Sequence, residues 1–108
     1  MNASNTTAAE DSQPGFSLRK VGLVLKDPVR WRILRELAKG EPLPVIELAR
    51  RVRRTQDCVS KNMLMLKVAG LAVQGYGRLY RLSPACQPAP GSMDVDLGVC
   101  VLKLGALP

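Results

Sequence analysis

From residue 18 to residue 39 the apolar positions recur at intervals of three and four, the spacing of residues that share one face of an α-helix. Ser17 is suited to cap a first helix. Asp27 and Pro28 then start a second one, because Asp caps helices and Pro is favoured at their first position. Gly40 supplies a residue that readily adopts the left-handed conformation in which helices end. The pattern therefore predicts two consecutive helices.

The helical spacing continues in two further segments. Residues 45–52 predict a short helix with Ile46 and Leu48 on its inward face. Thr55 is suited to cap the next helix, which we expect over residues 56–69. Two helices joined by such a tight turn form a helix-turn-helix.

The period then changes from 3.6 to 2 over residues 71–82, which predicts a β-hairpin. A two-residue turn at Tyr76-Gly77 would place Val73 opposite Tyr80 and create one apolar face. The hairpin would follow the helix-turn-helix directly.

The two ends of the chain differ from its middle. Residues 1–16 are rich in Asn, Ser, Thr and Ala and are expected to form a disordered tail, and residues 83–94 form a Pro- and Gly-rich linker. Within residues 95–108, an apolar run over 95–104 predicts a strand that needs cover on both faces, from the domain or from a dimer partner. The expected fold is mainly α with a small antiparallel β wing: a winged helix-turn-helix over residues 17–82, followed by an extra strand.

Charge and composition narrow the function. The 108 residues suffice for one domain, and 16 Lys and Arg against 9 Asp and Glu give a net charge of +7. Residues 17–82 alone hold 15 basic and 5 acidic side chains, a net charge of +10 that is typical of proteins bound to a polyanion. The absence of histidine excludes the commonest catalytic triads and imidazole metal sites, so we expect neither an enzyme nor a cofactor. An aromatic content of 4% argues against stacking on single-stranded nucleic acid.

The chain has no apolar run near the roughly 20 residues that span a bilayer, and its first residues lack the basic start of a signal peptide. Its three cysteines, Cys58, Cys86 and Cys100, suit neither a disulfide framework nor a metal site. We therefore expect a cytoplasmic protein without membrane or metal partners.

Three stretches of the sequence carry a family resemblance: Leu25-Lys26-Asp27-Pro28-Val29-Arg30-Trp31-Arg32-Ile33-Leu34-Arg35-Glu36-Leu37, then Glu47-Leu48-Ala49, then Val59-Ser60-Lys61-Asn62-Met63 running on to Leu66 and Ala69-Gly70-Leu71. They resemble the motifs of ArsR-type winged-helix repressors over about residues 18–82. Asn62 stands where the family usually has His, and Arg53 where Gly is common. The metal-sensing cysteine and histidine sites of some members have no counterpart, and the expected strand replaces the usual C-terminal dimerisation helix. The resemblance therefore implies a DNA-binding repressor, but no response to metals.

The expected function is sequence-specific binding of double-stranded DNA by a transcriptional regulator, with helix 56–69 in the major groove. On the helix, Gln56 suits adenine, and Lys61 suits guanine or a phosphate. Asp57 either accepts a hydrogen bond from cytosine or simply repels the DNA backbone. Arginines beside the helix suit phosphates. The predicted DNA-binding residues are Arg53, Arg54, Thr55, Gln56, Asp57, Ser60, Lys61, Arg78 and Arg81.

Surplus apolar residues predict a homodimer, because one small core does not need all of them. The expected dimerisation residues are Leu18, Val21, Leu25, Val99 and Val101.

Leu64 and Val68 lie one turn apart on a side of the recognition helix that the family usually keeps polar. They suit a thymine methyl group, a partner subunit or the C-terminal strand, and packing is favoured over base contact.

Two alternative functions stay open. The domain also fits a winged-helix interaction module that binds another protein through the strand or the wing, with a positive charge that is incidental or serves solubility. It also fits a thiol-based redox regulator, because Cys58 lies in the first turn of helix 56–69, where the helix dipole and neighbouring arginines favour a thiolate and Asp57 opposes it. The sequence leaves the operator unknown, and whether the effector is a small molecule or an oxidant.

Overall fold

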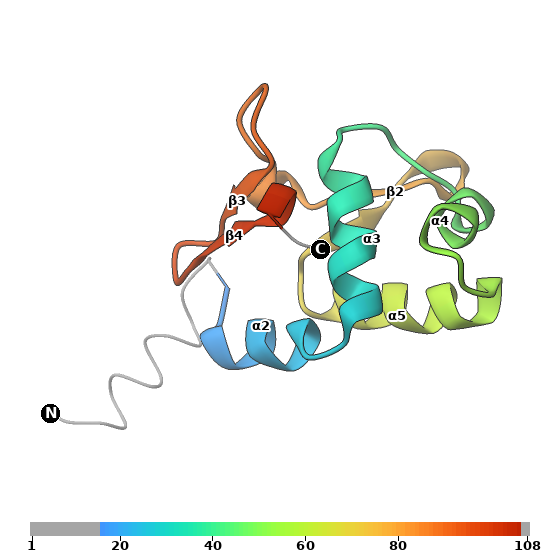
Figure 1. Ribbon diagram of the computed structural model, residues 1–108, viewed down its shortest axis with the longest axis horizontal. Coiled ribbons are helices and arrows are strands. Elements are labelled where there is room, and N and C mark those ends of the chain that lie inside the picture. The colour runs from blue at the N-terminus through green and yellow to red at the C-terminus, as the bar shows by residue number, and fades with distance from the viewer. Residues whose placement is uncertain (1–15, 107–108) are drawn as a thin grey trace, which may run out of the picture.

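The structure is a computed structural model that describes residues 16–106. The expected tail lies outside these residues except for Phe16. Over the described part the fold is α+β, with four α-helices and two small antiparallel sheets (Figure 1). This confirms the expected fold class at that level. The elements are α2 (Leu18–Leu25), α3 (Pro28–Ala38), α4 (Val45–Val52), α5 (Gln56–Val68), β1 (Ala72–Gln74), β2 (Tyr80–Leu82), β3 (Asp94–Asp96) and β4 (Val101–Lys103).

The helices begin where the capping residues predict. The side chain of Ser17 accepts a hydrogen bond from the Lys20 amide at 3.4 Å, and that of Asp27 accepts one from the Val29 amide at 2.9 Å. Thr55 caps α5 by accepting a hydrogen bond from the Cys58 amide at 3.2 Å. Each cap satisfies an amide that has no partner within its helix, so these boundaries are set by local chemistry.

The core is centred on α3, which packs against α2, α4, α5 and β2 (Figure 1). Its side chains Ile33, Leu34 and Leu37 are almost completely buried. The neighbouring helices contribute Val21, Val24, Leu48, Val52, Val59, Met63 and Leu66.

The expectation that Ile46 points inward is wrong, because 61% of this residue is exposed. The buried residues of α4 are Leu48, Ala49 and Val52. Ile46 is two positions before Leu48, which places it across the helix from that residue.

The β1–β2 hairpin forms, but its register differs by one residue from the expected one. Val73 pairs with Arg81 rather than Tyr80, because a five-residue connection replaces the two-residue turn. Leu43 also holds Tyr80 through two backbone hydrogen bonds, of 2.7 and 2.9 Å. This contact comes from a segment almost forty residues earlier, and it fixes which residue of β2 faces the core.

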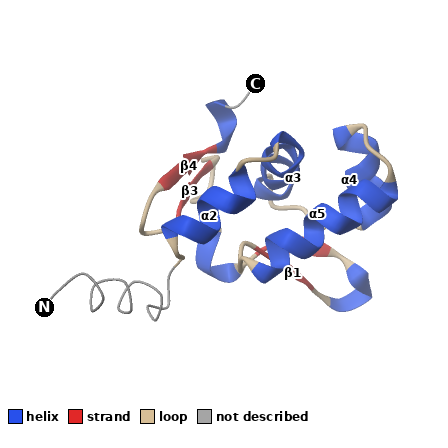
Figure 2. Cartoon of the chain, turned by 90° about the horizontal axis from the view of Figure 1, so that it is seen from below, coloured by secondary structure: helices blue, strands red, loops and turns tan. Residues whose placement is uncertain are grey.

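The expectation of one continuous strand over residues 95–104 is also wrong. The chain turns at Gly98 (φ 84°) and forms the antiparallel β3–β4 hairpin. The Gly98 amide donates to the Asp96 side chain at 2.9 Å, which stabilises the turn. Val95, Leu97 and Leu104 are buried in the same core as the helices, so this hairpin packs on the domain itself (Figures 1 and 2).

The segment expected as an extended linker contains a short 3-10 helix, Pro84–Cys86. Cys86 is 1% exposed, and its Sγ donates to the Leu71 carbonyl at 3.3 Å. The connection is therefore part of the packed domain.

Candidate nucleic-acid interface

The three residues Arg53, Arg54 and Thr55 connect α4 to α5. Arg53 has φ 59° and ψ 49°, the left-handed conformation that the turn requires. The Arg54 amide donates to the Ala49 carbonyl at 3.1 Å, a bond that closes the end of α4. An arginine side chain therefore occupies a strained position that glycine would adopt without cost.

The first two turns of α5 present polar side chains to solvent. Gln56, Asp57, Ser60 and Lys61 are all exposed. Val59, Met63 and Leu66, on the opposite face, are 0% exposed and anchor the helix to the core. The predicted reading residues therefore share one accessible surface.

The β1–β2 hairpin supplies a second group of cations. Arg78 and Arg81 are exposed, and Arg78 is left-handed at φ 61°. Lys67 of α5 donates to the Gln74 side chain at 3.3 Å, which holds the hairpin beside the helix. The helix α5 packs against both α4 and β1.

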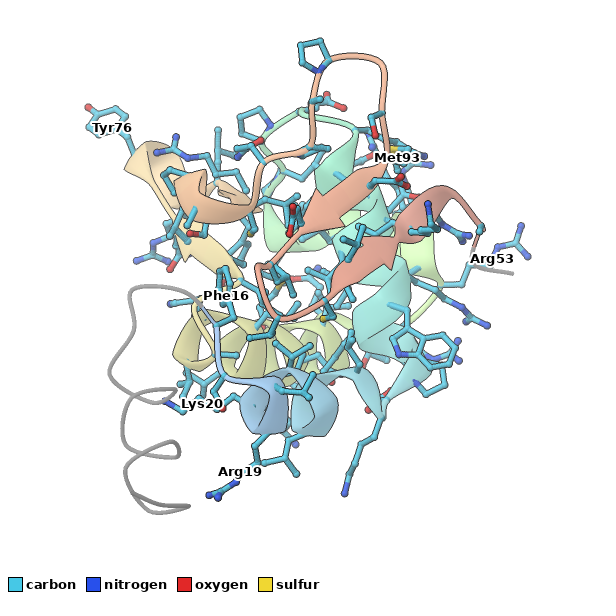
Figure 3. The ribbon with its side chains drawn as sticks, turned by 90° about the vertical axis from the view of Figure 1, so that its left-hand side faces the viewer. Phe16, Arg19, Lys20, Arg53, Tyr76 and Met93 are labelled. Carbon is cyan, nitrogen blue, oxygen red and sulfur yellow. The ribbon has the colours of Figure 1, made fainter. Side chains whose placement is uncertain are left out.

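Figure 3 looks along the long axis and labels Arg53 and Tyr76, which lie on opposite sides of the molecule. The turn before α5 and the hairpin loop are therefore well separated in the molecule. Within residues 16–106, Arg53 and Arg78 are the two non-glycine residues with positive φ. Such backbone strain is concentrated at functional sites.

The structure divides the four arginines near the end of α4 into two pairs. Arg51 donates to Glu47 at 2.8 Å, to Glu41 at 3.1 Å and to Glu36 at 3.5 Å. Arg50 also forms an ion pair with Glu47. Hydrogen bonds from Arg50 and then Arg51 lower the pKa of Glu47 from its ordinary 4.5 to about 2. These two arginines are thus largely neutralised within the fold.

The arginines of the turn behave differently. Among the ion pairs of residues 16–106, none includes Arg53, Arg54, Lys61, Arg78 or Arg81. The side chain of Arg54 donates to the Arg53 carbonyl at 3.0 Å, a contact that leaves its charge in place. Cations outside these ion pairs therefore lie around the first turns of α5 and on the hairpin, as they also do on α2 and α3.

Asn62 is a structural residue that sequence reasoning did not identify as one. It is 7% exposed, and its Oδ1 accepts a hydrogen bond of 2.8 Å from Nε of Arg30. Its Nδ2 donates to the Cys58 carbonyl at 2.9 Å, while Arg30 also donates to the carbonyls of Leu23 and Val24. Asn62 thus connects α5 to α3 and to the end of α2. The sequence signal for this role was its position, because Asn62 lies three residues after Val59 and four before Leu66 and so shares the buried face of the helix with them.

The last two turns of α5 are apolar on the outside. Leu64 is 58% exposed, Met65 41% and Val68 74%. The β3–β4 hairpin packs elsewhere, so of the three alternatives for Leu64 and Val68 the C-terminal strand is excluded, and a thymine methyl group or a partner subunit stays open.

The expected dimerisation residues do not all reach the surface. Val21 is 2% exposed and belongs to the core, so its assignment to a dimer interface is wrong. The helical face of α2 that turns inward carries Val21 and Val24. Leu25 is half-buried, whereas Leu18, Val99 and Val101 are exposed.

No family model, curated protein or solved structure matches this chain. In the part of the chain that the structure describes, no group of Cys, Asp or Glu side chains is arranged to hold a metal ion. None of the helices described there has the length and apolar character needed to cross a membrane.

Proposed function

We propose that this protein is a sequence-specific, double-stranded DNA-binding transcriptional regulator with a winged helix-turn-helix, similar to ArsR-type repressors. The observation that carries the proposal is the exposed polar surface on the first two turns of α5, a helix that directly follows Arg53 and Arg54 and packs against the hairpin strand β1. In this assignment α4 and α5 form the helix-turn-helix and the β1–β2 hairpin is the wing.

The proposed contacts follow from the chemistry of the exposed side chains. A helix of 13 residues is roughly 20 Å long and fits the major groove. The Gln56 amide suits the paired donor and acceptor of adenine, and the Lys61 ammonium suits the two acceptors of guanine. Arg53 and Arg54 on one side, with Arg78 and Arg81 on the other, would bind phosphates and set the register.

The proposal is tested by selecting bound duplexes from a random pool and measuring affinity for the selected duplex by fluorescence anisotropy. Each phosphate contact contributes roughly −0.9 to the slope of log K against log salt, so we expect a slope steeper than about −4. Lys61→Ala should weaken binding by at least about fivefold. Arg19→Ala is the matched control, because it removes an exposed charge from α2. Binding that is indifferent to salt, or equal losses in both variants, would contradict the proposal.

The exposed Leu64, Met65 and Val68 favour a second candidate, a winged-helix module that binds another protein. The double variant Lys61→Ala, Arg54→Ala separates the two functions. A DNA reader loses duplex binding in this variant, whereas a protein adaptor that docks on apolar residues keeps its partner.

A homodimer remains part of the proposal, now through Leu18, Val99 and Val101 rather than Val21. Two symmetry-related copies of α5 would then enter successive major grooves. Sedimentation velocity over a range of protein concentrations tests this assembly, and a monomer at every concentration would contradict it.

A further inference from the structure

A cavity of about 330 Å³ opens between the second halves of α3 and α4 and the turn that follows α4. Its lining is dominated by the arginines Arg32, Arg35, Arg51, Arg53 and Arg54. Glu36 and Val52 complete the wall. A volume of this size is within the range of small-molecule sites, which is roughly 300 to 1,000 Å³.

The single carboxylate in this wall does not neutralise the cavity. Glu36 is already engaged by Arg51 at 3.5 Å and by Lys39 at 3.1 Å. Arg51 in turn donates to three carboxylates and acts as a fixed part of the wall.

Arg32, Arg53 and Arg54 line the same cavity, and the ion pairs of residues 16–106 include none of them. Arg53, whose backbone is left-handed, lies at the edge of the cavity. Figure 3 shows Arg53 extending outward at the side of the molecule opposite Tyr76.

Guanidinium groups gathered around one concavity repel one another until an anion enters. Each guanidinium is planar and donates two parallel hydrogen bonds, a geometry that matches the oxygens of a phosphate group. Three such groups around one cavity match several linked phosphates better than a single carboxylate.

We propose that this arginine cavity binds linked phosphate groups. They belong either to a free di- or triphosphate anion or to the backbone of bound DNA. Arg53 and Arg54 are shared with the proposed DNA interface, whereas Arg32, on α3, belongs to the cavity alone. Arg32 therefore separates this site from the reading face of α5.

The test is isothermal titration of the full chain with sodium tripolyphosphate in about 150 mM NaCl. We expect one saturable site, and a Kd at least about tenfold weaker in Arg32→Gln, because charged hydrogen bonds contribute about that much. Arg19→Gln removes an exposed arginine from α2 and should stay within about twofold of the parent chain. Circular dichroism checks that each variant is folded, and Arg54→Gln gives a second variant of the same wall.

The proposal is overturned if tripolyphosphate shows no saturable binding, or if Arg32→Gln and Arg19→Gln bind it equally. Duplex DNA then identifies the source of the phosphates. If Arg32→Gln weakens duplex binding and reduces the salt slope by about 0.9, the cavity holds a backbone phosphate. If duplex binding is unchanged, the cavity serves a free polyphosphate.

The same measurements distinguish this inference from the proposed function. Tripolyphosphate binding without duplex binding would support the cavity and contradict the DNA reader. If duplex binding depends on Lys61 but tripolyphosphate does not bind, the result would support the DNA reader and contradict the arginine cavity.

Discussion

Replacing Arg53 by glycine should stabilise the fold while it weakens DNA binding. An L-residue in the left-handed conformation costs roughly 1 to 2 kcal/mol, and Arg53 has φ 59° and ψ 49°. Glycine removes this cost but adds about 0.4 to 1 kcal/mol of conformational entropy to the unfolded chain. The mid-range values, about 1.5 and about 0.7 kcal/mol, give a net gain of about 0.8 kcal/mol in the free energy of unfolding for Arg53→Gly. For a domain of this size, that raises Tm by about 3 to 6 °C.

Arg53→Ala is the matched control for this prediction. Alanine removes the same positive charge but keeps a Cβ atom, so the backbone strain persists. Both variants should reduce the slope of log K against log salt by about 0.9 if Arg53 binds a phosphate. Thermal and urea unfolding measure stability, and fluorescence anisotropy measures duplex affinity at several salt concentrations.

The two readouts refute separate steps of the reasoning. If Arg53→Gly is no more stable than Arg53→Ala, the left-handed conformation of residue 53 does not destabilise the folded protein. If both variants bind duplex as the parent chain does, at every salt concentration, Arg53 makes no phosphate contact.

Three further predictions follow from the interior and its ion pairs. Asn62→Ala removes the acceptor of the 2.8 Å hydrogen bond from Arg30. This variant should lower the free energy of unfolding, measured by urea titration, by about 1 to 3 kcal/mol, and an unchanged value would contradict the bridging role of Asn62. The pKa of Glu47 falls from 4.5 to about 2 on folding, so its ion pairs stabilise the protein above about pH 5 and this stability is lost as the pH falls to 2. In Glu47→Gln, the midpoint of urea unfolding should therefore depend less on pH between about 5 and 2 than it does in the parent chain. Burial raises the pKa of the Cys86 thiol, so iodoacetamide at pH 8 should modify the half-buried Cys58 in the folded protein but reach Cys86 only after unfolding, as followed by mass spectrometry.

Much of the architecture is local in the sequence and could be predicted from it. The starts of α2, α3 and α5 follow from Ser17, Asp27 and Thr55, because each cap bonds an amide two or three residues away. The exposed position of Lys61 follows from its place in the helical period. The overall positive charge needs no structure at all.

One error arose where a distant segment decides the position, because the register of the β1–β2 hairpin depends on the bridge from Leu43 to Tyr80. Another was local, because a turn at Gly98 divides the C-terminal apolar run into two strands. Val21 lies in the core because α2 packs through Val21 and Val24. A helical period does not specify which side of its apolar face another element will cover.

The sequence by itself determined the helices, their capping residues and a basic central segment. Only the tertiary structure decided which of those charges remain available. Arg51 is neutralised by Glu36 and Glu41, which are ten or more residues away in the chain. Arg53 and Arg54 follow it by two and three residues, line the arginine-rich cavity, and take part in no ion pair among the described residues. The physical reason is that an ion pair requires a separation of a few ångströms, and packing alone sets that distance between residues far apart in sequence.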